Sequence, residues 1–176
     1  MSLVLDNNYK KYLDKIKTLY LQTFPEYERR SFSQLKKIIS NNNGEVLSIL
    51  YQGQFAGFLI LLKHENTTLI DYFAIKKEFR GRSIGSKAIK KLDIGNPIII
   101  EIEPVDQKSS NNYQRIKRKS FYENLGFKSK NIKVHWYKTT FELMSLNDDN
   151  LVNSYFALLD HIFTKEERIK NISLIP

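Results

Sequence analysis

Apolar positions in the first half of the chain change from a helical spacing to a strand spacing. Between residues 8 and 22 they recur every three or four positions, which predicts a helix with one apolar face. A second, short helix is predicted over residues 34–39, with Ser31 or Ser33 as its N-cap. Three further apolar runs predict antiparallel strands, the first two joined as a hairpin by a Gln-Gly turn, at residues 45–51, 54–63 and 67–75.

The second half of the chain alternates helices with strands and then adds a helix. The alternating elements are predicted at residues 83–92, 97–103, 112–124, 128–134 and 136–144. Behind a polar Asn-Asp-Asp-Asn cluster, apolar residues from Leu151 to Phe163 form a broad helical face. That helix either packs on the chain's own sheet, which is favoured, or contributes to a homodimer or partner contact.

These elements together predict a mixed α/β (α+β) fold with a mostly antiparallel central sheet flanked by helices. One domain is expected over residues 1–176, with a core over residues 1–146 and a C-terminal helical extension over residues 147–176. A chain of 176 residues is long enough to bury a sizeable core.

Composition narrows the class of protein. Hydrophobic residues make up 41% of the chain, but no run of apolar residues is long enough to span a membrane, and the first residues do not resemble a secretory signal. The sequence contains no cysteine, which excludes disulfides and a thiol nucleophile and makes the cytoplasm the expected location. The formal net charge of +9 favours an anionic partner, for which a phosphorylated cofactor and a nucleic acid are the candidates.

The segment from Asp71 to Ser86 carries the clearest chemical signal. An apolar strand leads into Arg80-Gly81-Arg82-Ser83-Ile84-Gly85-Ser86, and a helical pattern follows. A glycine-containing turn between a strand and a helix directs backbone N–H groups at one place, where they can bind phosphate. The spacing excludes a Walker A loop and a dinucleotide fingerprint, so the alternatives are another phosphate loop or a plain strand–helix connection.

The loop resembles the acyl-CoA pyrophosphate loop of the GNAT superfamily of N-acyltransferases, whose motif is [RQ]-x-x-G-x-[GA]. The chain departs from it at Ser83, where the family usually has glycine. Because serine does not adopt a positive φ cheaply, the backbone at Ser83 is expected to have an ordinary conformation. Downstream, the residues from Ser120 to Phe127 resemble the family's [FL]-Y-x-x-x-G-F element, and the resemblance covers about residues 45–145.

The resemblance implies the GNAT fold and transfer of an acetyl group from acetyl-CoA to a primary amine, by direct attack on the thioester. The expected cofactor-binding residues are Phe73, Ala74, Ile75, Arg80, Gly81, Arg82, Ser83, Gly85 and Ser86. Backbone N–H groups of the strand over residues 72–75 would stabilise the oxyanion. Tyr122 is the candidate general acid for the leaving thiolate, and its alternative role is packing beside Phe121.

Four carboxylates are candidates for binding the amine or accepting its proton. Glu101 and Glu103 alternate with isoleucines on the strand 97–103 and are expected to share one face. Glu101 is assigned to catalysis, by holding the amine or relaying its proton through water, and Glu103 to acceptor binding. Glu26 and Glu28 lie in the loop that, in the family, closes over the acceptor. Surface charge is an equally good explanation for all four.

The sequence gives weaker support to other kinds of function. The three histidines, His64, His135 and His161, are scattered, so neither a metal site nor a Ser-His-Asp triad is expected. A basic polyanion-binding protein is the rival hypothesis, supported by the cluster Arg115, Lys117, Arg118 and Lys119, but no nucleic-acid-binding signature is present. A family member that binds CoA without turnover is the third possibility. The expected partner is a small-molecule or peptide amine, and the sequence does not identify which.

Overall fold

The computed structural model describes residues 2–92, 95–136 and 139–175, and its chain divides into two compact units. The first contains residues 1–63 and 70–93, and the second contains residues 64–69 and 94–176. One boundary between the units falls within the strand β4, Thr67–Ile75: residues 67–69 belong to the second unit, and residues 70–75 belong to the first. The expectation of one domain over the whole chain stays a prediction.

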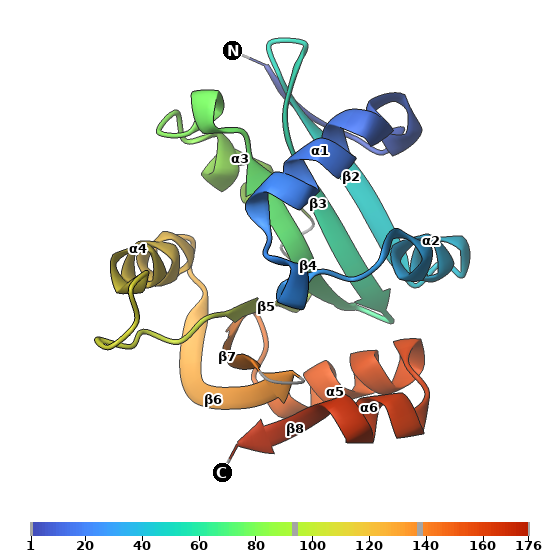
Figure 1. Ribbon diagram of the computed structural model, residues 1–176, viewed down its shortest axis with the longest axis vertical. Coiled ribbons are helices and arrows are strands. Elements are labelled where there is room, and N and C mark those ends of the chain that lie inside the picture. The colour runs from blue at the N-terminus through green and yellow to red at the C-terminus, as the bar shows by residue number, and fades with distance from the viewer. Residues whose placement is uncertain (1, 93–94, 137–138, 176) are drawn as a thin grey trace. The chain divides into compact units, whose positions relative to one another are not determined.

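The first unit places short helices beside antiparallel strands in the order β1-β2-β3-β4 (Figure 1). Its elements are β1 Leu3–Asp6, the 3₁₀ helix η1 Tyr9–Tyr12, α1 Leu13–Thr23, η2 Glu26–Glu28, α2 Phe32–Ser40, β2 Gly44–Tyr51, β3 Gln54–His64, β4, η3 Lys77–Phe79 and α3 Ile84–Lys90. The predicted hairpin is confirmed, and Gln52 and Gly53 form its turn at positive φ angles of 51° and 76°. Ser31 is the N-cap of α2, where its hydroxyl accepts from the Gln34 amide.

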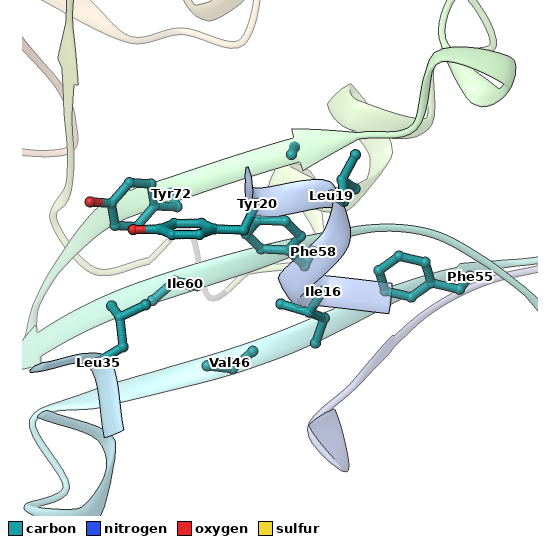
Figure 2. Close-up of a cluster of buried hydrophobic side chains, with 10 residues drawn as sticks. Ile16, Leu19, Tyr20, Leu35, Val46, Phe55, Phe58, Ile60 and Tyr72 are labelled. Carbon is teal, nitrogen blue, oxygen red and sulfur yellow. The ribbon is translucent and has the colours of Figure 1, made fainter. Parts of the chain in front are cut away.

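The core of the first unit gathers the apolar face of α1 against β2, β3 and β4. Figure 2 shows this cluster, in which Ile16, Leu19 and Tyr20 of α1 meet residues from the strands. The other members are Leu35, Val46, Phe55, Phe58, Ile60, Tyr72 and Ala74. Tyr20 and Tyr72 are 1% and 6% exposed, and their ring centroids lie 4.8 Å apart. Their hydroxyl groups lie at the same end of the cluster (Figure 2).

The described part of the second unit contains antiparallel strands in the order β5-β7-β6-β8 together with helices (Figure 1). Its elements are β5 Ile98–Ile102, α4 Asn112–Glu123, β6 Lys128–Trp136, β7 Thr139–Leu146, α5 Leu151–Ile162, α6 Lys165–Asn171 and β8 Ile172–Ile175. Within this unit the amide of Thr68, in the first part of β4, donates to the Pro97 carbonyl at 2.9 Å.

The C-terminal segment packs on its own chain. The apolar face of α5 is buried in the second unit, with Leu151, Tyr155, Leu158 and Leu159 each at most 1% exposed. The sequence predicted neither the helix α6 nor the strand β8, which comes after α6 and pairs with β6. It also missed β1, and it placed Trp136 in the next strand although Trp136 is the last residue of β6. Residues 137 and 138, at the predicted start of that next strand, lie outside the described residues.

The prediction of a mixed α/β fold with mostly antiparallel strands flanked by helices is confirmed, as is the added C-terminal helix. Within the described ranges, no helix has the length and apolar character needed to cross a membrane.

Candidate functional site

The connection from β4 to α3 is an exposed loop tied to the end of the strand. The Arg80 guanidinium donates from Nε to the Ile75 carbonyl at 2.9 Å, so the loop turns back onto β4 at its first residue. Two residues then take the left-handed conformation, Gly81 at φ 75° and Ser83 at φ 56°. Left-handed residues in a tight turn help to direct successive backbone amides to one side, where they can bind an anion.

The expectation of an ordinary backbone conformation at Ser83 is wrong. Ser83 has φ 56° and ψ 17° and is the residue from which α3 begins. The entry into the helix requires this conformation, which costs an L-residue roughly 1–2 kcal/mol. The chain therefore keeps at Ser83 the backbone geometry that glycine adopts easily, although a serine occupies the position.

The first turn of α3 presents backbone donors. The Lys87 amide is the first to donate within the helix, to the Ser83 carbonyl at 3.0 Å. The amides of Ile84, Gly85 and Ser86 come before Lys87 in the chain and therefore have no acceptor within the helix. Ile84 is 1% exposed and anchors this turn in the first unit. Residues 81–86 thus form a fixed turn whose chemistry suits an anionic ligand.

The end of β4 leaves no room for a side chain at one position of β3. A Cβ built on Gly57 of β3 would be 2.2 Å from the Ala74 carbonyl oxygen, so only glycine fits there. The Lys76 amide donates to the Ala56 carbonyl at 2.9 Å just beyond this point. The sequence analysis did not identify Gly57. The one feature that could have indicated it is a glycine inside an otherwise apolar strand, which often marks close approach of another backbone.

The connection between α1 and α2 is tied to β4 through backbone groups. The Tyr72 hydroxyl donates to the Glu28 carbonyl at 2.7 Å and accepts from the Arg30 amide at 2.9 Å. The Tyr20 hydroxyl donates to the Arg30 carbonyl at 3.0 Å. Two buried tyrosines therefore hold the backbone of the loop that carries Glu26 and Glu28. Glu26 is exposed and Glu28 is half-buried.

An ion pair reinforces this connection. Arg30 donates from Nε and Nη2 to the two carboxylate oxygens of Asp71, at 2.9 and 3.0 Å, and the side chains are 11% and 5% exposed. Burial, with the Asp71 charge beside it, raises the pKa of the Tyr72 hydroxyl far above its usual value. Burial also raises the pKa of the Tyr20 hydroxyl, against the opposing effect of its hydrogen bond with Tyr72. Both tyrosines stay protonated at neutral pH.

The sequence analysis missed this network. Its signal was Asp71, a charged residue within an otherwise apolar strand, because a buried carboxylate requires a partner. The identity of that partner was not readable, since Arg30 lies 41 residues away along the chain.

In the second unit, Glu103 is 9% exposed and paired with α4. Arg115 donates to one carboxylate oxygen at 2.8 Å and Arg118 to the other at 3.0 Å. Asn111 adds longer contacts at 3.3 and 3.4 Å. Two guanidinium groups therefore neutralise Glu103 and fix the N-terminal half of α4 beside the end of β5.

Glu101, two residues earlier on β5, contacts other elements. One of its carboxylate oxygens accepts from the Trp136 indole N–H at 2.8 Å and from the Tyr155 hydroxyl. These donors come from β6 and α5. The structure thus links Glu101 and Glu103, expected on one face of the strand, to different helices.

Tyr122 lies in the last turn of α4 and is 7% exposed. Its ring centroid is 5.0 Å from that of Phe121 and 5.4 Å from that of Phe127. Burial raises the pKa of the Tyr122 hydroxyl to about 12, and nearby Arg118 opposes this only in part. The hydroxyl is therefore protonated at neutral pH, as a general acid must be.

The basic cluster on α4 is largely engaged within the unit. Besides the pairing of Arg115 and Arg118 with Glu103, Lys119 donates to Glu142 at 2.7 Å, and Glu142 is 4% exposed. The Lys117 ammonium lies 4.3 Å from the centre of the Tyr113 ring. These contacts weaken the case for α4 as a surface that binds a polyanion.

The predicted site residues divide between the units. The predicted cofactor residues, with Glu26 and Glu28, belong to the first unit, and Tyr122, Glu101 and Glu103 belong to the second. Among the residues that the structure describes, no group of three or more His, Cys, Asp or Glu side chains is arranged to hold a metal ion.

The fold and the loop agree with sequence comparisons. A family model described as the acetyltransferase (GNAT) domain matches residues 42–129, which include the loop after β4 and the end of α4. The chain belongs to the GNAT acetyltransferase family. A Bacillus subtilis (strain 168) protein named "Putative acetyltransferase YjbC" is 34% identical over 71 residues. That match covers 40% of this chain and spans 35% of the relative's own length.

Solved structures show the same fold at low sequence identity. A GNAT-family protein of Bacteroides thetaiotaomicron superposes with a TM-score of 0.67 at 16% identity, covering 97% of this chain and 98% of its own. A Bacillus subtilis acetyltransferase in complex with CoA gives a TM-score of 0.58 at 19% identity, covering 82% of this chain and 96% of its own.

Proposed function

We propose that this protein is an N-acetyltransferase that transfers an acetyl group from acetyl-CoA to a primary amine by direct attack on the thioester. The observation that carries the proposal is the loop at residues 80–86, with left-handed residues at Gly81 and Ser83 and a fixed first helical turn. A site built from backbone amides suits a pyrophosphate group. The match to the acetyltransferase (GNAT) domain includes this loop, and a solved structure with the same fold is a complex with CoA, which supports CoA as the ligand.

Most of the predicted residues have a direct role in this proposal, whereas the Arg80 side chain fixes the start of the loop by donating to the Ile75 carbonyl. The amides of residues 81–86 bind the pyrophosphate, and backbone groups of Phe73, Ala74 and Ile75 bind the acyl end of the cofactor and stabilise the oxyanion. Tyr122 donates its proton to the departing thiolate. Glu101 holds the amine or relays its proton through water.

The remaining carboxylates serve the acceptor. Glu26 and Glu28 bind it from a connection whose backbone is held by Tyr20, Tyr72 and Arg30. The two guanidinium partners of Glu103 favour a role in orienting α4, so its contribution to acceptor binding is indirect. The acceptor is a small-molecule or peptide amine, and the proposed location is the cytoplasm.

Calorimetric titration with CoA tests the cofactor loop. Gly85→Val is expected to weaken binding by at least about tenfold, because a β-branched side chain in the first turn of α3 blocks the approach of a phosphate to the amides. Gly53→Asn is the matched control, since Gly53 has φ 76° at the exposed tip of the hairpin and asparagine tolerates that conformation. Failure of the unmodified protein to bind CoA at millimolar concentration contradicts the proposal.

Turnover is tested separately. Free thiol released from acetyl-CoA is measured against a panel of amines that includes spermidine, kanamycin and a lysine-containing peptide with a free N-terminus. Amine-dependent thiol release supports the transferase. Tight CoA binding without release for any amine favours a family member that binds CoA without turnover.

A further inference from the structure

In the first unit, the strand β3 contains a β-bulge close to the end of β4. Two consecutive residues of β2 pair with Phe55 and Gly57, so Ala56 is an extra residue on β3. Because of this extra residue, Phe55 and Phe58 lie on the same face and share the apolar cluster, although they are three positions apart (Figure 2). The bulge therefore changes the path of β3 immediately before Gly57.

Gly57 and the bulge fix the direction of the peptide groups at the end of β4. The Ala74 carbonyl oxygen lies where a side chain of residue 57 would stand, so this carbonyl points toward β3. Because the peptide bond is trans, the Ile75 N–H points the opposite way, away from β3. The Lys76 amide donates to the Ala56 carbonyl at 2.9 Å, so the Ile75 carbonyl points away from β3 as well.

The side of β4 that faces away from β3 at Ile75 is the side of the candidate cofactor loop. The Arg80 guanidinium donates from Nε to the Ile75 carbonyl at 2.9 Å, and Arg80 is exposed. Ile75 itself is half-buried. The N–H and the carbonyl of one extended residue point to the same side, so the Ile75 amide is directed toward the side on which the exposed first residue of the loop lies.

Packing of the two strands does not by itself require this arrangement. A regular antiparallel pair accepts a side chain at every position, as β3 does at Phe58, Leu59 and Ile60, which are at most 3% exposed. A β-bulge and an interior glycine each weaken a strand, and both are typical of places where a strand is re-aimed beside a functional site or approached closely by another backbone. Here both occur where β4 leads into the loop.

We propose that Gly57 is a positioning residue for the arm of acetyl-CoA that carries the acyl group: it allows the Ala74 carbonyl to lie against β3 and thereby aims the Ile75 N–H at this arm. The inference rests on the proposed function, since it concerns the same cofactor. A methyl group at residue 57 would push the end of β4 away by about 1 Å, because a carbon and a carbonyl oxygen approach to only about 3.3 Å.

Two ligands separate the arm from the phosphate groups. Acetyl-CoA and 3′-phosphoadenosine 5′-diphosphate share the phosphates, but only acetyl-CoA carries the pantetheine arm. Calorimetric titration gives the ratio of their affinities, which measures the contribution of the arm. Gly57→Ala is expected to lower this ratio by about three- to tenfold, as for the loss of one hydrogen bond, and to leave the affinity for the diphosphate within about twofold. In thiol-release assays kcat should fall by at least about tenfold.

Gly44→Ala is the matched control. A Cβ at Gly44 would lie 2.9 Å from the Leu61 carbonyl oxygen, so this variant introduces the same kind of overlap at the other end of the β2–β3 pair. Both variants should lose stability in urea, but the ratio of affinities should change in Gly57→Ala alone. A Gly57→Ala protein in which the two affinities fall by the same factor, or in which neither falls, overturns the positioning role whatever its stability.

A measurement on the unmodified protein does not depend on whether the variant folds. In isotopically labelled protein studied by NMR, the Ile75 amide proton is expected to shift downfield on saturation with acetyl-CoA but not with the diphosphate, because only the arm reaches it. An Ile75 signal that responds to neither ligand, or equally to both, overturns the inference.

The outcomes also separate the inference from the proposed function. A lowered affinity ratio in Gly57→Ala, in a protein that binds acetyl-CoA without releasing thiol, supports the role of Gly57 and contradicts the transferase. Normal thiol release and a normal affinity ratio in folded Gly57→Ala overturn the role of Gly57 and leave the transferase intact. Absence of CoA binding by the unmodified protein contradicts the proposed function and the inference together.

Discussion

At the scale of single residues, burial sets the chemistry of the tyrosine hydroxyls. Tyr122 has a pKa raised to about 12 by burial at the end of α4. Such a hydroxyl is fully protonated at neutral pH, but it is also a weaker acid than an ordinary tyrosine. The hydroxyl is therefore always available to donate a hydrogen bond to the departing thiolate, whereas full transfer of its proton is less favourable than from an ordinary tyrosine.

Tyr122→Phe should lower kcat by at least about tenfold and leave the affinity for acetyl-CoA nearly unchanged. The substitution keeps the ring and its contacts with Phe121 and Phe127, so only an interaction made in the transition state is lost. Steady-state rates and calorimetric CoA titration on the same preparation check this. Full activity in the variant would remove Tyr122 from the mechanism.

The same pKa predicts how stability depends on alkaline pH. The folded Tyr122 holds its proton up to a pH of about 12, whereas the unfolded residue loses it near 10, so the folded state binds more protons in this window. The contribution is fully present below pH 10 and is lost as the pH rises toward 12. At pH 11 it lowers the free energy of unfolding by about 1.4 kcal/mol relative to neutral pH.

Urea denaturation of the unmodified protein and of Tyr122→Phe at pH 7, 9 and 11 measures this effect. The difference in unfolding free energy between the two proteins is expected to shift by that amount in favour of the variant between pH 9 and pH 11. A difference that does not depend on pH would show that the hydroxyl is accessible to solvent and titrates normally.

At the scale of elements, the α1–α2 connection is held mainly by residues outside it. Tyr20 comes from α1, and Asp71 and Tyr72 come from β4, and together they hold the backbone at Glu28 and Arg30. A loop of charged residues has little apolar surface of its own to bury. Its position therefore depends on these polar contacts, and with it the placement of Glu26 and Glu28.

Asp71→Asn should lower the free energy of unfolding by about 3 kcal/mol, because it leaves the largely buried Arg30 guanidinium without its charge partner and turns an amide N–H₂ toward it. If the connection binds the acceptor, KM for the amine rises as well. The control is Glu45→Gln, whose pair with Lys63 is 32% and 44% exposed, and its cost should stay below about 1 kcal/mol. Equal losses in the two variants would show that the Arg30–Asp71 pair behaves as a surface pair.

At the scale of the whole molecule, the chain divides into two units of different content. The first contains the candidate cofactor loop and the α1–α2 connection. The second contains the candidate acid, the β5 carboxylates and the C-terminal segment. The segment after Leu146 belongs structurally to the second unit, since α5 supplies core residues and β8 adds a strand beside β6.

A chain that stops after Leu146 should lose more than about 10 °C in melting temperature or fail to fold, because it exposes the surface covered by Tyr155, Leu158 and Leu159. The emission of Trp136 should shift to longer wavelength, since the indole loses the Tyr155 hydroxyl and the Phe163 ring. Calorimetry and fluorescence measure the two effects.

A second chain that stops after Phe163 is the control for this truncation. It keeps α5 and removes α6 and β8, whose Ile172 pairs with Trp136, so it should show a smaller loss of stability and a smaller shift of the Trp136 emission than the shorter chain. Unchanged melting temperature and sedimentation in the shorter chain would show that the whole C-terminal segment is dispensable.

The sequence by itself determined the elements with a clear local period. The strand Thr67–Ile75 was predicted with its observed bounds, and the helices now seen as α4 and α5 were predicted to within one residue. The motif Arg80–Gly85 and the element ending at Phe127 also identified the family before the fold was known. Helices and strands of this kind can be predicted because the spacing of apolar residues along the chain indicates which face is buried.

Only the tertiary structure decided which polar residues meet. The contacts of Arg30 with Asp71 and of Tyr155 with Glu101 join residues 41 and 54 positions apart, and no local spacing encodes such a pairing. The four-residue strand β8 has too few positions to show a period, and its register is set by β6. The left-handed backbone at Ser83 contradicts the local preference of serine, because Arg80 is tied to the end of β4 and Ile84 is buried, and these two anchors fix the path of the loop between them.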